Sequence, residues 1–187
     1  WPEAARVKLD ISPATQASGH VFLRVLQDAL LSGDGSSDML LPRVDQSVLL
    51  PDAAVAWLKQ HGAEVVTGQH VDDLSPYVSS PVLLACPSWE AARLTESLYS
   101  EWAAQAAALQ HTAIATVYLR ANAELRWPNP MMALASGPQT PAQFAFDKGR
   151  LSQDPSLQGV LALVVSACDA DRDSISAAVC LQAREQL

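Results

Sequence analysis

The chain has 187 residues, about half of them apolar, and a formal net charge of −8. That length fits one domain, or one domain with an elaboration, and the apolar share predicts a hydrophobic core rather than wholesale disorder. The acidic residues are spread along the chain. This excludes a general nucleic-acid-binding surface, because neutralising phosphates requires clustered lysines and arginines. No run approaches the roughly 18 consecutive apolar residues of a membrane-spanning helix.

The first predicted element is a helix over residues 14–31, with Ser12 or Thr15 as its cap. Apolar residues recur within it at helical spacing and give it a wide apolar face. Residues 33–37 are glycine- and serine-rich, a composition that is typical of loops. The chain begins with Trp1 rather than methionine, and we expect it to be a piece of a longer protein.

The next predicted elements alternate between helix and strand. A helix over residues 48–61 ends at Gly62, a residue that commonly terminates helices. Strands are predicted over residues 63–71 and 82–85. A long helix over residues 89–110 follows, because its alanine-rich run has high helix propensity.

The second half of the chain has the composition of a sheet. Strands are predicted over residues 113–119, 131–135, 143–147 and 160–167. The last of these is a nearly continuous apolar run and indicates a central strand. A final helix, capped by Asp173 or Ser174, ends near Gln186. Turns rather than helices separate the strands, which favours an antiparallel or mixed sheet.

These elements predict an α+β fold with a mixed, largely antiparallel sheet flanked by helices. Residues 1–110 form a helical region with two strands, and residues 111–187 form a sheet with a C-terminal helix. We expect the two regions to pack as one compact unit.

Two patterns suggest a metal site, and each has a simpler structural interpretation. Asp169, Asp171 and Asp173 alternate like the start of a calcium loop, but the glycine and glutamate that such a loop needs are replaced by Ser174 and Cys180. A turn with a capping aspartate is therefore favoured. The four histidines lack ligand spacing, so no metal site is predicted; they are His20, His61, His70 and His111.

Cys86 and Ser88 lie where a predicted strand meets a predicted helix. A thiolate there would be stabilised by the helix dipole, and open α/β sheets place ligands at such strand ends. The alternative for Cys86 is a small buried residue that packs under the turn. Ser88 lacks the glycines of a hydrolase nucleophile elbow, so a serine hydrolase is not favoured.

Aromatic and methionine side chains concentrate in the second half of the chain. They are Tyr118, Trp127, Met131, Met132, Phe144 and Phe146. Such a group is usually core, but it would equally line an apolar cavity.

Several segments, taken in order, resemble one family. They read ASGHVFLRVLQD (17–28), SDMLLPRVD (37–45), LPDAA (50–54) with WL (57–58), GAEV (62–65), LLACP (83–87), IATVYL (114–119) and QFAFDKG (143–149). Together they resemble the squalene-associated FAD-dependent desaturases, the hydroxysqualene dehydroxylases of hopanoid synthesis, within the flavin amine oxidase and phytoene desaturase superfamily. The resemblance covers nearly the whole chain but only the middle of a family member.

The chain departs from the family's pattern in several places. The amino-terminal G-x-G-x-x-G fingerprint and the carboxyl-terminal segment that closes over the flavin are not in this sequence. The connection over residues 75–81 is short. Phe144 replaces a common tryptophan and Lys148 a common arginine.

The resemblance implies a flavoenzyme in which two discontinuous parts form the FAD domain around a substrate domain. It implies that Val71 lies against the adenine end of FAD and that Ala85, Cys86 and Pro87 form a turn beside the cofactor. A second set of residues would wall an apolar tunnel for an isoprenoid: Tyr118, Phe144 and Phe146. No catalytic residue is assigned, because the flavin does the redox chemistry in such enzymes.

The expected function is therefore that of the substrate-domain portion of an FAD-dependent oxidoreductase acting on a squalene-like isoprenoid. We expect the longer parent to be the enzyme and this chain alone to be inactive and to bind FAD weakly or not at all. The alternative is a stand-alone, non-catalytic module that binds an apolar ligand or a protein. The expected location is cytoplasmic, with peripheral contact at the inner face of the membrane left open, as is self-association through exposed sheet edges.

Overall fold

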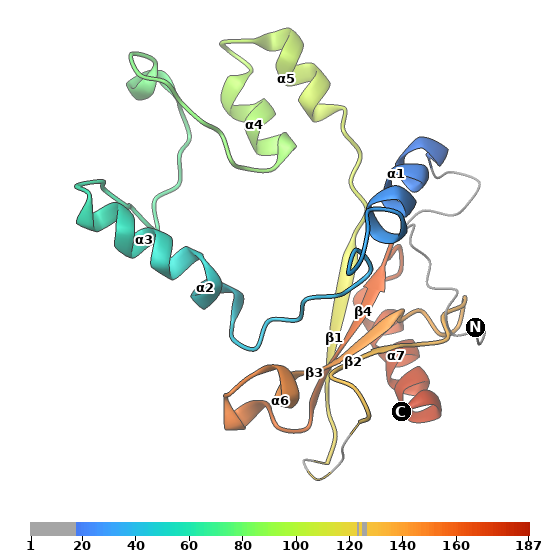
Figure 1. The fold of residues 1–187 in the computed structure, drawn as a ribbon. Coiled ribbons are helices and arrows are strands. Elements are labelled where there is room, and N and C mark those ends of the chain that lie inside the picture. Colours follow the sequence, from blue (N-terminus) through green and yellow to red (C-terminus); the bar gives the residue numbers. More distant parts are fainter. Residues whose placement is uncertain (1–17, 123, 125–126) are drawn as a thin grey trace. The chain divides into compact units, whose positions relative to one another are not determined.

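The structure is a computed structural model that describes residues 18–187 apart from residues 123, 125 and 126. Its chain divides into two compact units (Figure 1). The sheet unit contains the described residues up to Ala54 together with Thr112–Leu187, and the helical unit is Val55–His111. Within the described residues, no helix is long and apolar enough to cross a membrane.

The sheet unit is built on a four-stranded sheet. Its strands are β1 (Ile114–Arg120), β2 (Met131–Ala133), β3 (Phe144–Asp147) and β4 (Val160–Ser166). They are ordered β1-β4-β3-β2, and every neighbouring pair is antiparallel. The α+β class is confirmed, and so is the central position of the apolar run at residues 160–167, because β4 pairs on both sides. The sheet is antiparallel throughout rather than mixed.

The core of the sheet unit lies between one face of the sheet and α7 (Arg172–Gln186), which runs along that face in Figure 1. Leu163 from β4 and Val179 from α7 are fully buried there. Gln182 is also fully buried, and its amide bonds both the N–H and the C=O of Ala142 at 2.8 Å. A polar group can remain in this core because its hydrogen bonds are satisfied.

Near the start of the described chain, α1 spans Gly19–Leu30 and none of its residues is buried. Ser18 caps it by accepting a hydrogen bond from the Val21 N–H at 3.5 Å. Residues 14–17 of the predicted helix and its predicted caps, Ser12 and Thr15, lie outside the described residues.

The predicted helix over residues 48–61 forms as two helices, α2 (Gln46–Leu49) and α3 (Pro51–Gln60). The break falls at Leu50, because a proline disfavours helical geometry in the residue before it. Gly62 ends α3 as predicted. Its φ of +80° suits glycine, and the Ala63 N–H bonds back to the Leu58 carbonyl at 2.9 Å.

One predicted helix, over residues 89–110, is wrong as a single element. The structure has α4 (Ser88–Thr95) and α5 (Ser100–Ala107), and the N–H groups of Leu98 and Tyr99 close a turn on the Thr95 carbonyl. The turn lets the alanine faces of the two helices bury against each other, through Ala92, Ala103 and Ala106. This burial outweighs the high helix propensity of the uninterrupted sequence.

The two predicted strands at residues 63–71 and 82–85 are also wrong, because the structure assigns neither segment to a strand. A strand exists only where its backbone pairs with a neighbour, and no ladder partner is found for either segment among the described residues. Three short elements were not predicted. They are η2 (Ser75–Tyr77), α6 (Lys148–Leu151) and η3 (Pro155–Leu157).

Candidate functional site

Three of the four residues expected beside a cofactor line one cavity of the helical unit. Val71, Ala85 and Cys86 surround about 530 Å³ of space, which we call the Val71 cavity. Pro87, at the start of α4, is not among its lining residues. The other lining side chains are mostly aliphatic, and none carries a charge. The cavity therefore suits an uncharged group and has no cation for a phosphate.

Arg93 of α4 fixes the segment that carries Val71. Its Nη2 donates to the Val71 carbonyl at 2.9 Å and its Nη1 to the Asp72 carbonyl at 3.2 Å. Its Nε donates to the Glu90 carboxylate at 2.7 Å, and this bond raises the pKa of Arg93 above its ordinary value. Sequence reasoning missed this arginine, because about twenty residues separate it from the segment it contacts.

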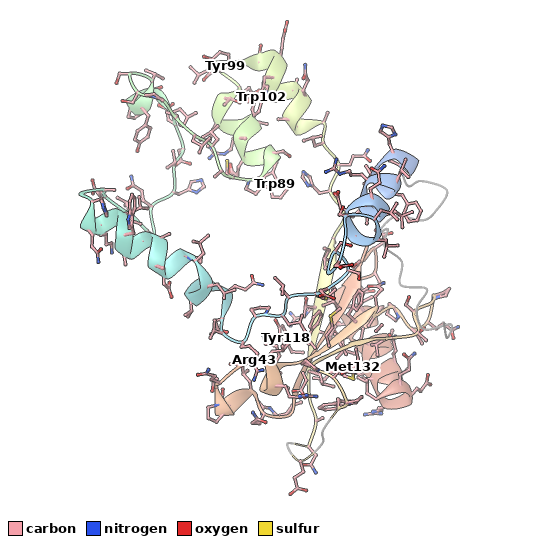
Figure 2. The ribbon with its side chains drawn as sticks, viewed as in Figure 1. Arg43, Trp89, Tyr99, Trp102, Tyr118 and Met132 are labelled. Atoms are coloured by element: carbon pink, nitrogen blue, oxygen red, sulfur yellow. The ribbon has the colours of Figure 1, made fainter. Side chains whose placement is uncertain are left out.

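A second cavity of the helical unit, of about 830 Å³, is lined by residues of α4, α5 and the segment before them. Cys86 is half-buried and lines both cavities, so it is not simply sealed beneath the turn. Tyr99 and Trp102, labelled in Figure 2, also line the second cavity.

The structure pairs Ser88 with a histidine that no motif suggested. The Ser88 Oγ lies 2.9 Å from the His111 Nε2, and the Trp89 ring meets the imidazole edge-on at 4.8 Å. No carboxylate among the described residues bonds His111, so the pair lacks the third member of a catalytic triad. The pair joins the start of α4 to the end of the helical unit.

The three residues expected to wall a substrate tunnel share one face of the sheet. In the strand register, Tyr118 and Phe146 are both opposite Ala162, and Phe144 is opposite Val164. The rings of Phe144 and Phe146 are 6.5 Å apart between centroids. Since α7 and the core occupy the other face, these aromatic side chains are left partly exposed. We call this surface the aromatic face.

A cleft of about 450 Å³ lies over part of the aromatic face. It is lined by Tyr118 and Phe146 of the sheet and by Leu41, Pro42 and Val44 of the segment around Arg43, which Figure 2 labels. Arg43 itself and Phe144 are not among its lining residues. The lining is mixed, because four polar side chains join the apolar ones: Asp45, Gln46, Thr116 and Lys148. A cleft that combines apolar walls with polar groups can fix the orientation of a small molecule.

The acidic triplet forms a helix cap rather than a calcium loop. Asp171 precedes α7, and its Oδ1 accepts hydrogen bonds from the N–H groups of Asp173 and Ser174 at 3.0 Å. The predicted capping role is correct, but the capping residue is Asp171 rather than Asp173 or Ser174. No group of three His, Cys, Asp or Glu side chains in the described part of the chain could hold a metal ion.

The candidate surfaces thus fall in two units. The helical unit carries the uncharged Val71 cavity, and the sheet unit carries the aromatic face with its cleft. Compared with known proteins, the chain matches no family model, no curated protein and no solved structure.

Proposed function

We propose that this chain is the substrate-domain portion of an FAD-dependent oxidoreductase that acts on a squalene-like isoprenoid. The observation that carries the proposal is the aromatic face, on which Tyr118, Phe144 and Phe146 remain partly exposed beside a cleft. A hydrocarbon has no hydrogen bonds to offer, so it is bound by the burial of apolar area, at about 25 cal/mol per Å². Three aromatic side chains on one sheet face supply such area.

FAD fits the helical unit in part. The Val71 cavity would take an uncharged ring of the cofactor, because its lining is aliphatic and carries no charge. Nothing in that lining would neutralise the cofactor's phosphates, so they would be held by residues outside the cavity. The redox chemistry would come from the flavin when bound, and the side chains of this chain would orient the substrate and exclude water.

A test on this chain uses squalene as the probe, delivered in cyclodextrin and followed by tryptophan fluorescence. Tyr118→Ser and Phe146→Ser each remove aromatic area from the cleft, and we expect each to weaken binding roughly fivefold or more. Leu181→Ser is the matched control, since Leu181 is an exposed apolar residue on α7. Equal binding by all four proteins, wild type included, would remove the aromatic face from the proposal.

A test on the longer parent addresses the enzyme itself. We expect it to bind flavin and to turn over hydroxysqualene, whereas the 187-residue chain alone should purify without stoichiometric flavin absorbance. A parent that neither binds flavin nor turns over this substrate would defeat the enzyme assignment.

The alternative is a non-catalytic module that binds an apolar ligand. The uncharged lining of the Val71 cavity favours this alternative, because it offers no cation to a cofactor phosphate. The coding sequence on both sides of this segment distinguishes the oxidoreductase from the non-catalytic module. A dinucleotide fingerprint upstream and a flavin-closing segment downstream support the oxidoreductase, and their absence supports the module.

A further inference from the structure

Arg93 is a charged residue that bonds the wall of the Val71 cavity, through the Val71 carbonyl. In a flavoprotein segment without a phosphate loop, such an arginine would be the first candidate for a phosphate ligand, because its planar fork suits phosphate oxygens. The contacts of Arg93 in this structure argue against that role.

The guanidinium of Arg93 is already engaged on its three nitrogens. Nη2 and Nη1 bond the carbonyls of Val71 and Asp72, and Nε bonds the Glu90 carboxylate. The Asp72 carboxylate adds a further negative charge, 3.8 Å from Nη1. A single cation thus faces two carboxylates, so an incoming phosphate would meet a net negative charge.

The same contacts link α4 to one wall of the cavity. Leu94, the next residue of α4, lines the cavity from the helix, and Val71 lines it from the extended segment. Bonds from one side chain to two successive carbonyls fix both the position and the direction of a backbone that has no partner strand. Without them, no hydrogen bond from α4 would hold the carbonyls of Val71 and Asp72.

We infer that Arg93 is a positioning residue that holds Val71 in the wall of the cavity, and that the cavity accepts an uncharged ring system rather than a phosphate. The choice of adenosine as the probe for that ring rests on the proposed function, in which Val71 lies against the adenine end of FAD. The role of Arg93 in holding the segment does not, because it concerns this chain alone.

The first experiment measures backbone order parameters by NMR in the full 187-residue chain. In Arg93→Gln we expect the values at Val71 and Asp72 to fall from about 0.85 to below about 0.6, while those of α4 stay unchanged. Arg93→Lys should not rescue them, since an ammonium can pair with Glu90 but lacks the fork that spans two carbonyls. Arg24→Gln is the control, because Arg24 also pairs with a carboxylate, that of Asp28, at an exposed position of α1.

Unchanged order parameters in Arg93→Gln would overturn the positioning role, whether or not the parent proves to be a flavoenzyme. The second experiment titrates the chain with adenosine and with AMP, which differ by one phosphate. We expect adenosine to bind at least as tightly as AMP and Arg93→Gln to weaken adenosine roughly fivefold or more. Tighter binding of AMP that falls with salt and survives Arg93→Lys would identify Arg93 as a phosphate ligand instead.

Discussion

At the residue scale, the side chain of Asp171 fixes where α7 begins. Its carboxylate accepts hydrogen bonds from the Ser174 hydroxyl at 2.6 Å and from two backbone N–H groups at the start of α7. These N–H groups have no partner within the helix, so the carboxylate supplies the one they need. The bond from Ser174 is the main reason why the pKa of Asp171 lies below its ordinary value.

We expect Asp171→Ala to lower the melting temperature of the chain by roughly 2–4 °C near neutral pH. Asp169→Ala is the matched control, because Asp169 is exposed and no hydrogen bond joins its carboxylate to another of the residues that the structure describes. Differential scanning calorimetry of the three proteins measures both effects. An equal loss in the two variants would mean that general charge, rather than the cap, is responsible.

The same cap makes a pH-dependent contribution to stability. The pKa of Asp171 is lower in the folded chain than its ordinary value of 3.8. Its stabilising effect is therefore complete above that value and is lost as the pH falls below it through the folded-state pKa. We expect the difference between wild type and Asp171→Ala to shrink over that interval. A constant difference would contradict the ionised cap.

At the element scale, the α4–α5 pair shows that packing between two helices can determine where the first of them ends. No glycine or proline separates the two helices, and the alanines at both ends of the stretch favour one long helix. Alanine has little side chain to bury, however, and only close contact between two helices removes its surface from water. The turn after Thr95 makes that contact between α4 and α5 available.

We expect Ala103→Leu to destabilise this pair by about 1–3 kcal/mol, because the larger side chain does not fit between the helices. Ala103 is only 4% exposed. Ala104, one residue along α5, is exposed and provides the control Ala104→Leu, which should be nearly neutral. Chemical denaturation followed by circular dichroism gives both values. If the two variants behave alike, the helices do not pack as described.

At the scale of the whole molecule, each unit has an apolar cluster of its own. Leu163 and Val179 belong to the cluster beneath the sheet, whereas Ala92, Ala103 and Ala106 form the cluster of the helical unit. A cavity made in one cluster removes contacts from that cluster alone. Stability should therefore be lost unit by unit rather than uniformly.

We expect Leu163→Ala to destabilise the sheet unit by about 2–5 kcal/mol, because Leu163 is fully buried at the centre of β4. Hydrogen exchange should accelerate at the amides of β1, β3 and β4 and remain unchanged in α4 and α5. Leu181→Ala, at an exposed position of α7, is the control. Equal acceleration in both units would show that they unfold together.

The sequence predicted most reliably those features whose signals are local. The apolar run of β4, the glycine that ends α3 and the acidic residue before α7 can all be found from a few neighbouring residues. The two segments at residues 63–71 and 82–85 were predicted as strands from local composition alone. That composition favours extended backbone but does not provide a partner strand, so these predictions were wrong. Of the predicted surface residues, Phe144 and Phe146 are placed on one face by alternation along β3. Only the pairing of β1 and β3 with β4 places Tyr118 on the same face.

Sequence alone therefore determined the α+β class, the central strand and the aromatic alternation, because propensity and periodicity are properties of short stretches. Only the tertiary structure decided the strand order that places β4 between β1 and β3, the turn that divides the alanine-rich helix, and the bonds that join Arg93 to Val71 and Ser88 to His111. The strand order and the two bonds depend on groups that are distant along the chain, and the turn depends on the contact it allows between α4 and α5. Their meeting is set by which surfaces can be buried together, and no local pattern encodes that choice.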